Sequence, residues 1–227
     1  GDHRDLHLSI RRQRQMCIRD SQMTPRGKIL FIPHVSSEWR KYIKIRSIEI
    51  AKEFSHRGWD VYVVSRSLSK VRDVVWLLRN IRFVTEKKEG LTFIRVPYLP
   101  ALFQPFLLFN AFIIKTIAER LGIHVIVNSS PHSYAILKGH YIYVYDVVDE
   151  HSDAFNRPIS FMMKRFEKNE IKKADLVTTV SPSLEDKIMA LCKERKDRIL
   201  LLTNGTDPLA FRRVNEEQVS LIREKFK

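Results

Sequence analysis

Glycine is scarce in this 227-residue sequence, which holds only seven, at positions 1, 27, 58, 90, 122, 139 and 205. A Walker loop (GxxxxGKS/T) and a dinucleotide-binding GxGxxG turn both need glycines a few residues apart. Neither spacing occurs in this chain. Both glycine-rich phosphate-binding motifs are therefore excluded.

Cysteine and long hydrophobic runs are also in short supply. Cys17 and Cys192 are the only cysteines, which excludes a disulfide framework and a cysteine-rich zinc site and fits a reducing compartment. The longest apolar stretch, 101–114, is interrupted by polar residues and is shorter than the ~20 residues that span a bilayer. The N-terminus has no apolar segment typical of a secretory signal. These features predict a cytoplasmic protein.

Acidic residues are outnumbered, since 40 Lys and Arg face 26 Asp and Glu and the net charge is +14. Such a balance attracts phosphates, whether in nucleic acid, anionic lipid or a nucleotide-linked substrate. A basic nucleic-acid-binding module is one alternative. Against it, the aromatic residues are not clustered with cations, and no helix-turn-helix, RNA-recognition or zinc signature is present. No nucleic-acid partner is expected.

The two ends of the chain differ from its middle. Residues 1–22 lack a hydrophobic period, and the segment 16–21 back-translates to a sequence similar to a transposon end used in preparing sequencing libraries. They are interpreted as a non-native or disordered tail. Without them the net charge is still +12. Residues 23–211 are predicted to form one domain, and 212–227 are interpreted as a linker and the truncated start of another.

From Lys28 onward, short apolar runs alternate with amphipathic stretches, a pattern typical of an α/β domain with a parallel sheet. We predict a Rossmann-like, doubly wound parallel sheet. Strands are expected at 28–33, 61–65, 91–96, 124–128, 141–145, 176–180 and 199–202. Helices are expected at 41–57, 68–80, 104–121, 132–138, 158–173 and 183–194.

Ligands bind outside the carboxyl ends of the strands in such sheets, and polar residues gather at these ends here. The densest ionisable cluster is Asp146–His151, where a carboxylate could accept a proton or stabilise positive charge. Alternatively, Asp149 and Glu150 cap the next helix and His151 is solvated. No metal site is expected, because no second histidine or carboxylate pair has ligand spacing.

Two Ser-Pro pairs follow predicted strands, at Ser130-Pro131 and at Ser181-Pro182. Proline suits the first turn of a helix, whose free N–H groups can bind anions. Ordinary N-capping by the serine is the alternative at both positions, and it is favoured for Ser181. Asn204-Gly205 is predicted to form a tight turn.

Paired segments late in the chain resemble a known family. The segment 170–184, followed by 199–211, is similar to the end of the N-terminal domain in GT-B glycosyltransferases of family 4 (glycosyl transferases group 1). The helix-strand segment 51–64 and the strand ends 129–132 and 144–149 also resemble this family. The resemblance covers residues 28–211 and implies the N-terminal, acceptor-side half of a GT-B fold.

The resemblance implies transfer of a sugar from a nucleotide diphosphate sugar to an acceptor, with retention and with no cofactor besides this donor substrate. A nucleotide-sugar epimerase of the same fold is the alternative. The family's donor-binding C-terminal domain, with its E-x7-E motif, does not occur in these residues. The chain is therefore expected to be inactive alone.

By the same resemblance, Asp146 and Asp149 are the candidate catalytic residues. Ser181, Asn204 and Gly205 are assigned to the donor side or the hinge. The family's first loop is often Gly-Gly-rich, whereas here it runs from His34 to Arg40 without glycine. Acceptor binding is assigned to His34, Ser36, Ser37, Trp39, Arg40, Lys41, Ser130, His132 and His151.

A lipid-linked acceptor and a role in cell-envelope polysaccharide synthesis would place the protein at the inner face of a membrane. Cations follow the first loop at Arg40, Lys41, Lys44 and Arg46. They could bind anionic headgroups, or they could form a solvated helix face. The segment 103–114 is interpreted as a core helix, although Phe106, Leu107, Phe109, Ile113 and Ile114 could instead add apolar area to such a surface.

Overall fold

The computed structural model describes residues 26–34, 45–67, 84–97, 104–130, 139–150, 157–205 and 223–224. These residues form one sheet of eight strands in the order β3-β4-β2-β1-β5-β6-β7-β8. All neighbouring pairs are parallel except β3 and β4. The strands are β1 (Lys28–Ile32), β2 (Asp60–Ser67), β3 (Val84–Lys88), β4 (Leu91–Pro97), β5 (Val125–Asn128), β6 (Ile142–Val147), β7 (Leu176–Thr179) and β8 (Ile199–Leu201).

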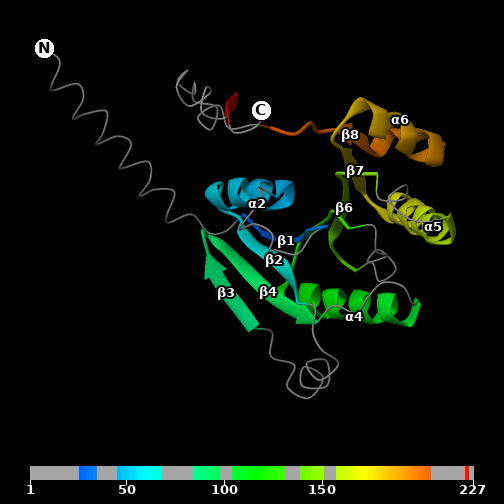
Figure 1. Ribbon diagram of the computed structural model, residues 1–227. Coiled ribbons are helices and arrows are strands. Elements are labelled where there is room, and N and C mark those ends of the chain that lie inside the picture. The colour runs from blue at the N-terminus through cyan, green and yellow to red at the C-terminus, as the bar shows by residue number, and fades with distance from the viewer. Residues whose placement is uncertain are drawn as a thin grey trace, which may run out of the picture.

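Helices lie on both faces of this sheet, as Figure 1 shows for α2 and α4, which are on opposite sides of β1 and β2. The helices are α2 (Arg46–His56), α4 (Gln104–Leu121), α5 (Arg157–Lys173) and α6 (Pro182–Leu191), followed by a 3-10 helix (Lys193–Arg198). The predicted Rossmann-like, doubly wound α/β fold is confirmed. None of the described helices is long and apolar enough to cross a membrane.

Burial on both faces explains why β1 is apolar from Ile29 to Ile32. Ile29 and Phe31 pack into a cluster that contains Ile48 and Ala51 of α2. Leu30 and Ile32 point to the other face and join the larger cluster. Successive side chains of a strand point to opposite faces, so a strand covered on both sides has no polar position. Packing on both faces of the sheet holds the strands in place, and it therefore also holds the polar residues at the strand ends in place.

All seven predicted strands are present, and the prediction missed β3. Its sequence, VTEKK, has no apolar run, and its residues from Thr85 to Lys88 are exposed. β3 is an edge strand that pairs antiparallel with β4. The turn between them places Glu89 at φ 52° and Gly90 at φ 75°. Two positive φ angles are typical of a type I′ hairpin turn, so the turn and the pairing, rather than apolarity, explain this strand.

Helix ends account for the other differences. The structure shows α2 from Arg46, whereas a start near 41 was predicted, and 41–44 lie outside the described residues. The predicted helix 183–194 is wrong at its end, because α6 stops at Leu191 and Cys192 adopts φ −145° before the 3-10 helix. The predicted helices 68–80 and 132–138, the tail 1–22 and residues 212–222 lie outside the described residues.

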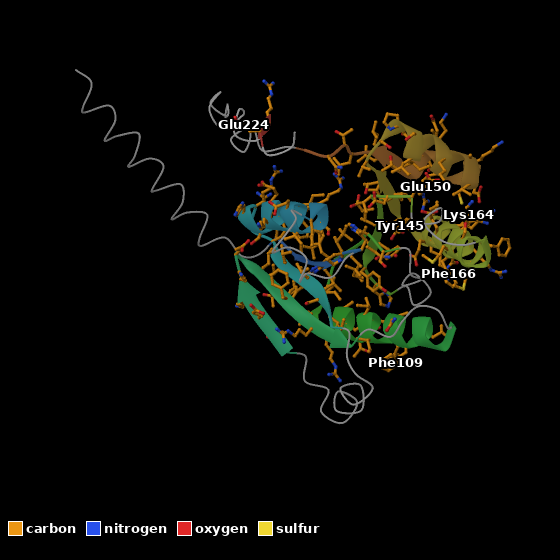
Figure 2. All side chains as sticks on the ribbon, viewed as in Figure 1. Phe109, Tyr145, Glu150, Lys164, Phe166 and Glu224 are labelled. Atoms are coloured by element: carbon orange, nitrogen blue, oxygen red, sulfur yellow. The ribbon has the colours of Figure 1, made fainter. Side chains whose placement is uncertain are left out.

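The segment 104–121 forms the predicted helix α4. One face of this helix packs in the hydrophobic core, as predicted for 103–114. Ala111, Ile113, Ile114 and Ile117 are buried. Phe109 packs against the same cluster while remaining partly exposed (Figure 2). The side chains of Phe106 and Leu107 are outside the described residues. Among the side chains of α4 that the structure describes, the large apolar ones that are exposed are Leu108 and Phe112.

Candidate functional site

The carboxylate of Asp146 lies at the centre of the polar groups on the strand ends. Asp146 is the fifth residue of β6 and pairs in register with Thr178 of β7. Its side chain is 3% exposed. Oδ1 accepts a hydrogen bond of 2.7 Å from the Thr178 hydroxyl, and Oδ2 accepts one of 3.3 Å from the Ser129 hydroxyl. The carboxylate thus connects the ends of β5, β6 and β7.

Arg46, the first residue of α2, supplies the positive charge that this buried carboxylate needs. Its Nε lies 3.4 Å from Asp146 Oδ2. A buried carboxylate without a cation or hydrogen-bond donors would be strongly unfavourable. Sequence reasoning missed this pair, because it grouped Arg46 with the surface cations. The side chain of Arg46 is only 12% exposed, so its assignment to a membrane-facing patch is corrected.

His34 and Asp149, both predicted site residues, come together at the ends of β1 and β6. His34 Nε2 is 3.9 Å from Asp149 Oδ2. This separation is too long for a hydrogen bond, and it becomes an ion pair when the imidazole is protonated. The Asp149 side chain is 69% exposed. The Asp149 side chain is therefore far more exposed than that of Asp146.

Ser130 is buried, and its backbone is held by Asn128, the last residue of β5. Asn128 Nδ2 donates to the Ser130 carbonyl at 2.9 Å, and the Ser130 N–H donates to Asn128 Oδ1 at 2.9 Å. Among the described residues, the Ser130 hydroxyl has no hydrogen-bond partner. Residues 131–138 lie outside the described part of the chain. Whether Ser130 caps a helix or binds a ligand thus stays a prediction.

The other described candidates have local partners. Ser181 is the N-cap of α6 and accepts a hydrogen bond of 3.3 Å from the Leu184 N–H, with Pro182 in the first turn. The capping interpretation of Ser181 is therefore confirmed. Asn204 Oδ1 accepts from Arg46 Nη1 at 2.9 Å, and Gly205 is exposed beside it. Their assignment to a hinge stays a prediction.

Glu150 follows Asp149 and turns toward α6. Its carboxylate forms an ion pair with Lys187, and burial lowers the pKa of the Lys187 ammonium group. Figure 2 shows Glu150 beyond the end of β6, on the side where α6 lies. Asp149 and Glu150 do not cap α5, which begins at Arg157, and residues 151–156 lie outside the described part of the chain.

The remaining predicted site residues lie outside the described part of the chain: Ser36, Ser37, Trp39, Arg40, Lys41, His132 and His151. Within the described part, no three His, Cys, Asp or Glu side chains gather where they could hold a metal ion. The candidate site is therefore built from His34, Arg46, Ser129, Asp146, Asp149 and Thr178.

Comparison with known proteins gives a family match and several structures with the same fold. The model of Glycosyltransferase Family 4 matches residues 45–208, which is more than half of the chain. No curated protein matches the sequence.

Several solved structures share the fold. A glycosyltransferase from Rickettsia africae is 19% identical with a TM-score of 0.56, and the match covers 88% of this chain and 49% of that one. Anabaena HepE in complex with UDP is 16% identical with a TM-score of 0.53, covering 88% and 50%. A sucrose-phosphate synthase chain from Thermosynechococcus elongatus is 17% identical with a TM-score of 0.50, covering 88% and 99%. This chain thus spans about half the length of the first and second of these proteins.

Proposed function

Because this chain belongs to Glycosyltransferase Family 4, we propose that it forms the acceptor-side domain of an enzyme that transfers a sugar from a nucleotide diphosphate sugar to an acceptor. The observation that carries the proposal is the family match over 45–208, which includes Arg46, Asp146 and Thr178. Anabaena HepE has been crystallised with UDP and with UDP-glucose, which supports a nucleotide sugar as the donor. Donor binding would then need a second domain, so this chain alone turns over no donor.

The two aspartates differ in what they can do chemically. Both oxygens of Asp146 already accept hydrogen bonds, and Arg46 lies beside them. This arrangement suits a fixed negative charge that stabilises positive charge developing on the transferred sugar. Asp149 is exposed and lies near His34. It has the room to accept the proton of an acceptor hydroxyl, as a general base must.

Retention at the anomeric carbon is part of the proposal, as are acceptor contacts from His34 and the first loop. The intact open reading frame, expressed and incubated with UDP- and GDP-sugars and sugar or lipid-linked acceptors, provides the test. Release of nucleoside diphosphate together with a glycosylated acceptor supports transfer, and NMR of the new linkage gives its stereochemistry. A changed sugar without any acceptor product identifies an epimerase instead.

Substitution of Asp146 tests the site within this enzyme. Asp146→Asn keeps the shape of the side chain and removes its charge, and it is expected to lower kcat by roughly 10²-fold, the scale of a positioned acid-base or charged group. Asp197→Asn is the matched control, because Asp197 is exposed in the 3-10 helix. Circular dichroism verifies that both variants fold. A kcat of Asp146→Asn equal to that of the control removes Asp146 from the chemistry.

A further inference from the structure

Arg46 places a positive charge at the N-terminus of α2, where the helix dipole is unfavourable for a cation. It is the first residue of α2, and the N-cap residue Ile45 offers no side-chain hydrogen bond. The N-terminus of a helix carries a partial positive charge, so a cation there is destabilising. A favourable tertiary contact must therefore hold the guanidinium in place.

Those contacts lie far away along the chain. Nη2 donates to the Leu202 carbonyl at 2.8 Å, and Nη1 donates to the Thr203 carbonyl at 3.2 Å and to Asn204 Oδ1 at 2.9 Å. Nε is 3.4 Å from Asp146 Oδ2. All three guanidinium nitrogens are thus engaged, two of them by the segment that directly follows β8. Since the hydrogen bonds to 202–204 are the shorter ones, this segment determines where the guanidinium sits relative to Asp146.

We propose that Arg46 is a positioning residue that couples the Asp146 carboxylate to the segment 202–204. The inference rests on the proposed function, because it concerns a carboxylate placed at the reacting centre. When 202–204 shifts, the carbonyls that hold Nη1 and Nη2 shift with it, and the guanidinium moves away from Oδ2. Asp146 then keeps Thr178 and Ser129 but loses its cation. The carboxylate is therefore paired with Arg46 and fully oriented only while 202–204 is in the arrangement described here.

If the hydrogen bonds of Arg46 only stabilised the fold, substitution of Arg46 would have a different effect. It would lower the folded fraction and leave kcat per folded molecule unchanged. Loss of a positioning residue lowers kcat in molecules that remain folded, because small displacements of reacting groups are costly. The two roles are therefore separated by kinetics on protein whose folded fraction is measured.

The experiment uses the enzyme from the intact reading frame. Arg46→Ala is expected to lower kcat about 10- to 100-fold, with KM for donor and acceptor changed less than about threefold. Millimolar guanidinium chloride is expected to restore part of kcat to Arg46→Ala, whereas equal sodium chloride is not. Asn204→Ala removes one Nη1 acceptor and leaves the core intact, so it reduces kcat by a smaller factor. Arg95→Ala is the matched control, because Arg95 is an exposed arginine of β4 that pairs with Glu86.

A second measurement does not depend on activity. In the 227-residue chain, hydrogen exchange at the backbone amides of 202–205 is expected to be several-fold faster in Arg46→Ala, and unchanged in Arg95→Ala. Unchanged kcat in Arg46→Ala, or a loss of kcat that guanidinium does not restore, overturns the coupling and leaves the proposed function standing. A wild-type enzyme that transfers no sugar overturns both. If Arg46→Ala fails to fold, Arg46→Lys and Asn204→Ala decide, and wild-type kcat in both overturns the coupling.

Discussion

Tyr143 of β6 donates its hydroxyl hydrogen to Oε2 of Glu170 in α5, and both side chains are buried. The same hydroxyl accepts a hydrogen bond of 2.7 Å from Asn128 Nδ2. The Asn128 side chain in turn donates to the Ser130 carbonyl and accepts from the Ser130 N–H. A continuous set of hydrogen bonds therefore runs from α5 to the end of β5, next to the candidate site.

Tyr143→Phe is expected to lower the free energy of unfolding by about 1 to 3 kcal/mol, because it removes one donor from the buried Glu170 carboxylate and one acceptor from Asn128. Urea denaturation followed by circular dichroism measures this change. Tyr62→Phe is the matched control, since Tyr62 is a partly buried tyrosine of β2. Equal stabilities of the two variants would show that the Tyr143 hydroxyl contributes nothing.

Stability is expected to fall at alkaline pH because of the buried tyrosines. Burial, followed by the nearby Glu170, raises the pKa of Tyr143 well above the usual 10.0. Burial, followed by Glu167, likewise raises the pKa of Tyr145. Above pH 10 the unfolded chain loses these protons while the folded chain keeps them, so the free energy of unfolding decreases as pH rises, by up to roughly 1.4 kcal/mol per pH unit for each group. Below pH 10 both states keep the protons and this contribution is constant.

Urea unfolding at pH 9, 10 and 11 measures this dependence, and Tyr143→Phe is expected to have a shallower decline than the wild type above pH 10. A wild-type free energy of unfolding that stays level between pH 10 and pH 11 contradicts the prediction.

Gly90 in the β3–β4 turn is expected to be intolerant of a side chain. Its φ is 75°, and a Cβ atom there would lie 2.8 Å from the Ser55 hydroxyl oxygen, which donates to the Gly90 carbonyl. Gly122 is the matched control, with φ 62° and open space around a Cβ. Gly122→Ala is expected to cost about 1 kcal/mol from backbone strain alone, and Gly90→Ala a further ~1 kcal/mol from crowding. Thermal or urea unfolding compares them, and equal losses would remove the crowding contribution.

The sequence predicts the strands that contain an apolar run and misses β3, which has none. The buried positions of β1 and β2, such as Leu30 and Val63, are apolar because helices cover both faces of the sheet there, and these apolar runs reveal both strands in the sequence. β3 is charged and exposed, and it exists because a turn at Glu89-Gly90 brings it against β4. That signal is a single Glu-Gly pair between two short runs. Pairing between strands depends on the tertiary arrangement, so it cannot be predicted from the residues of one strand alone.

One residue of the candidate site could be predicted from the sequence, and its partner could not. Asp146 could be selected from the sequence because it begins the densest ionisable cluster at a predicted strand end and because the segment 144–149 resembles the family. Its partner Arg46 lies a hundred residues earlier, where nearby cations made it resemble part of a surface patch. The predicted helix began near residue 41, so the sequence did not place Arg46 at the helix N-terminus, where the helix dipole opposes a cation. Only the folded arrangement connects the two residues.

Membrane association of this domain stays a prediction, and the structure narrows the residues that could produce it. Arg46 is engaged in the interior of the site and is removed from the set. Leu108 and Phe112, one helical turn apart on α4, are exposed. Three cations of the first loop region complete the set: Arg40, Lys41 and Lys44.

The chain is expected to sediment with vesicles rich in anionic lipid and much less with neutral ones, since each Lys or Arg near such a surface contributes roughly 1 kcal/mol. Replacing both Leu108 and Phe112 by Ser should lower the bound fraction several-fold, because it removes the apolar side chains that would enter the interface. Phe161→Ser is the matched control, as Phe161 is an exposed phenylalanine of α5. Equal and negligible sedimentation with both vesicle types removes the membrane hypothesis and favours a soluble acceptor.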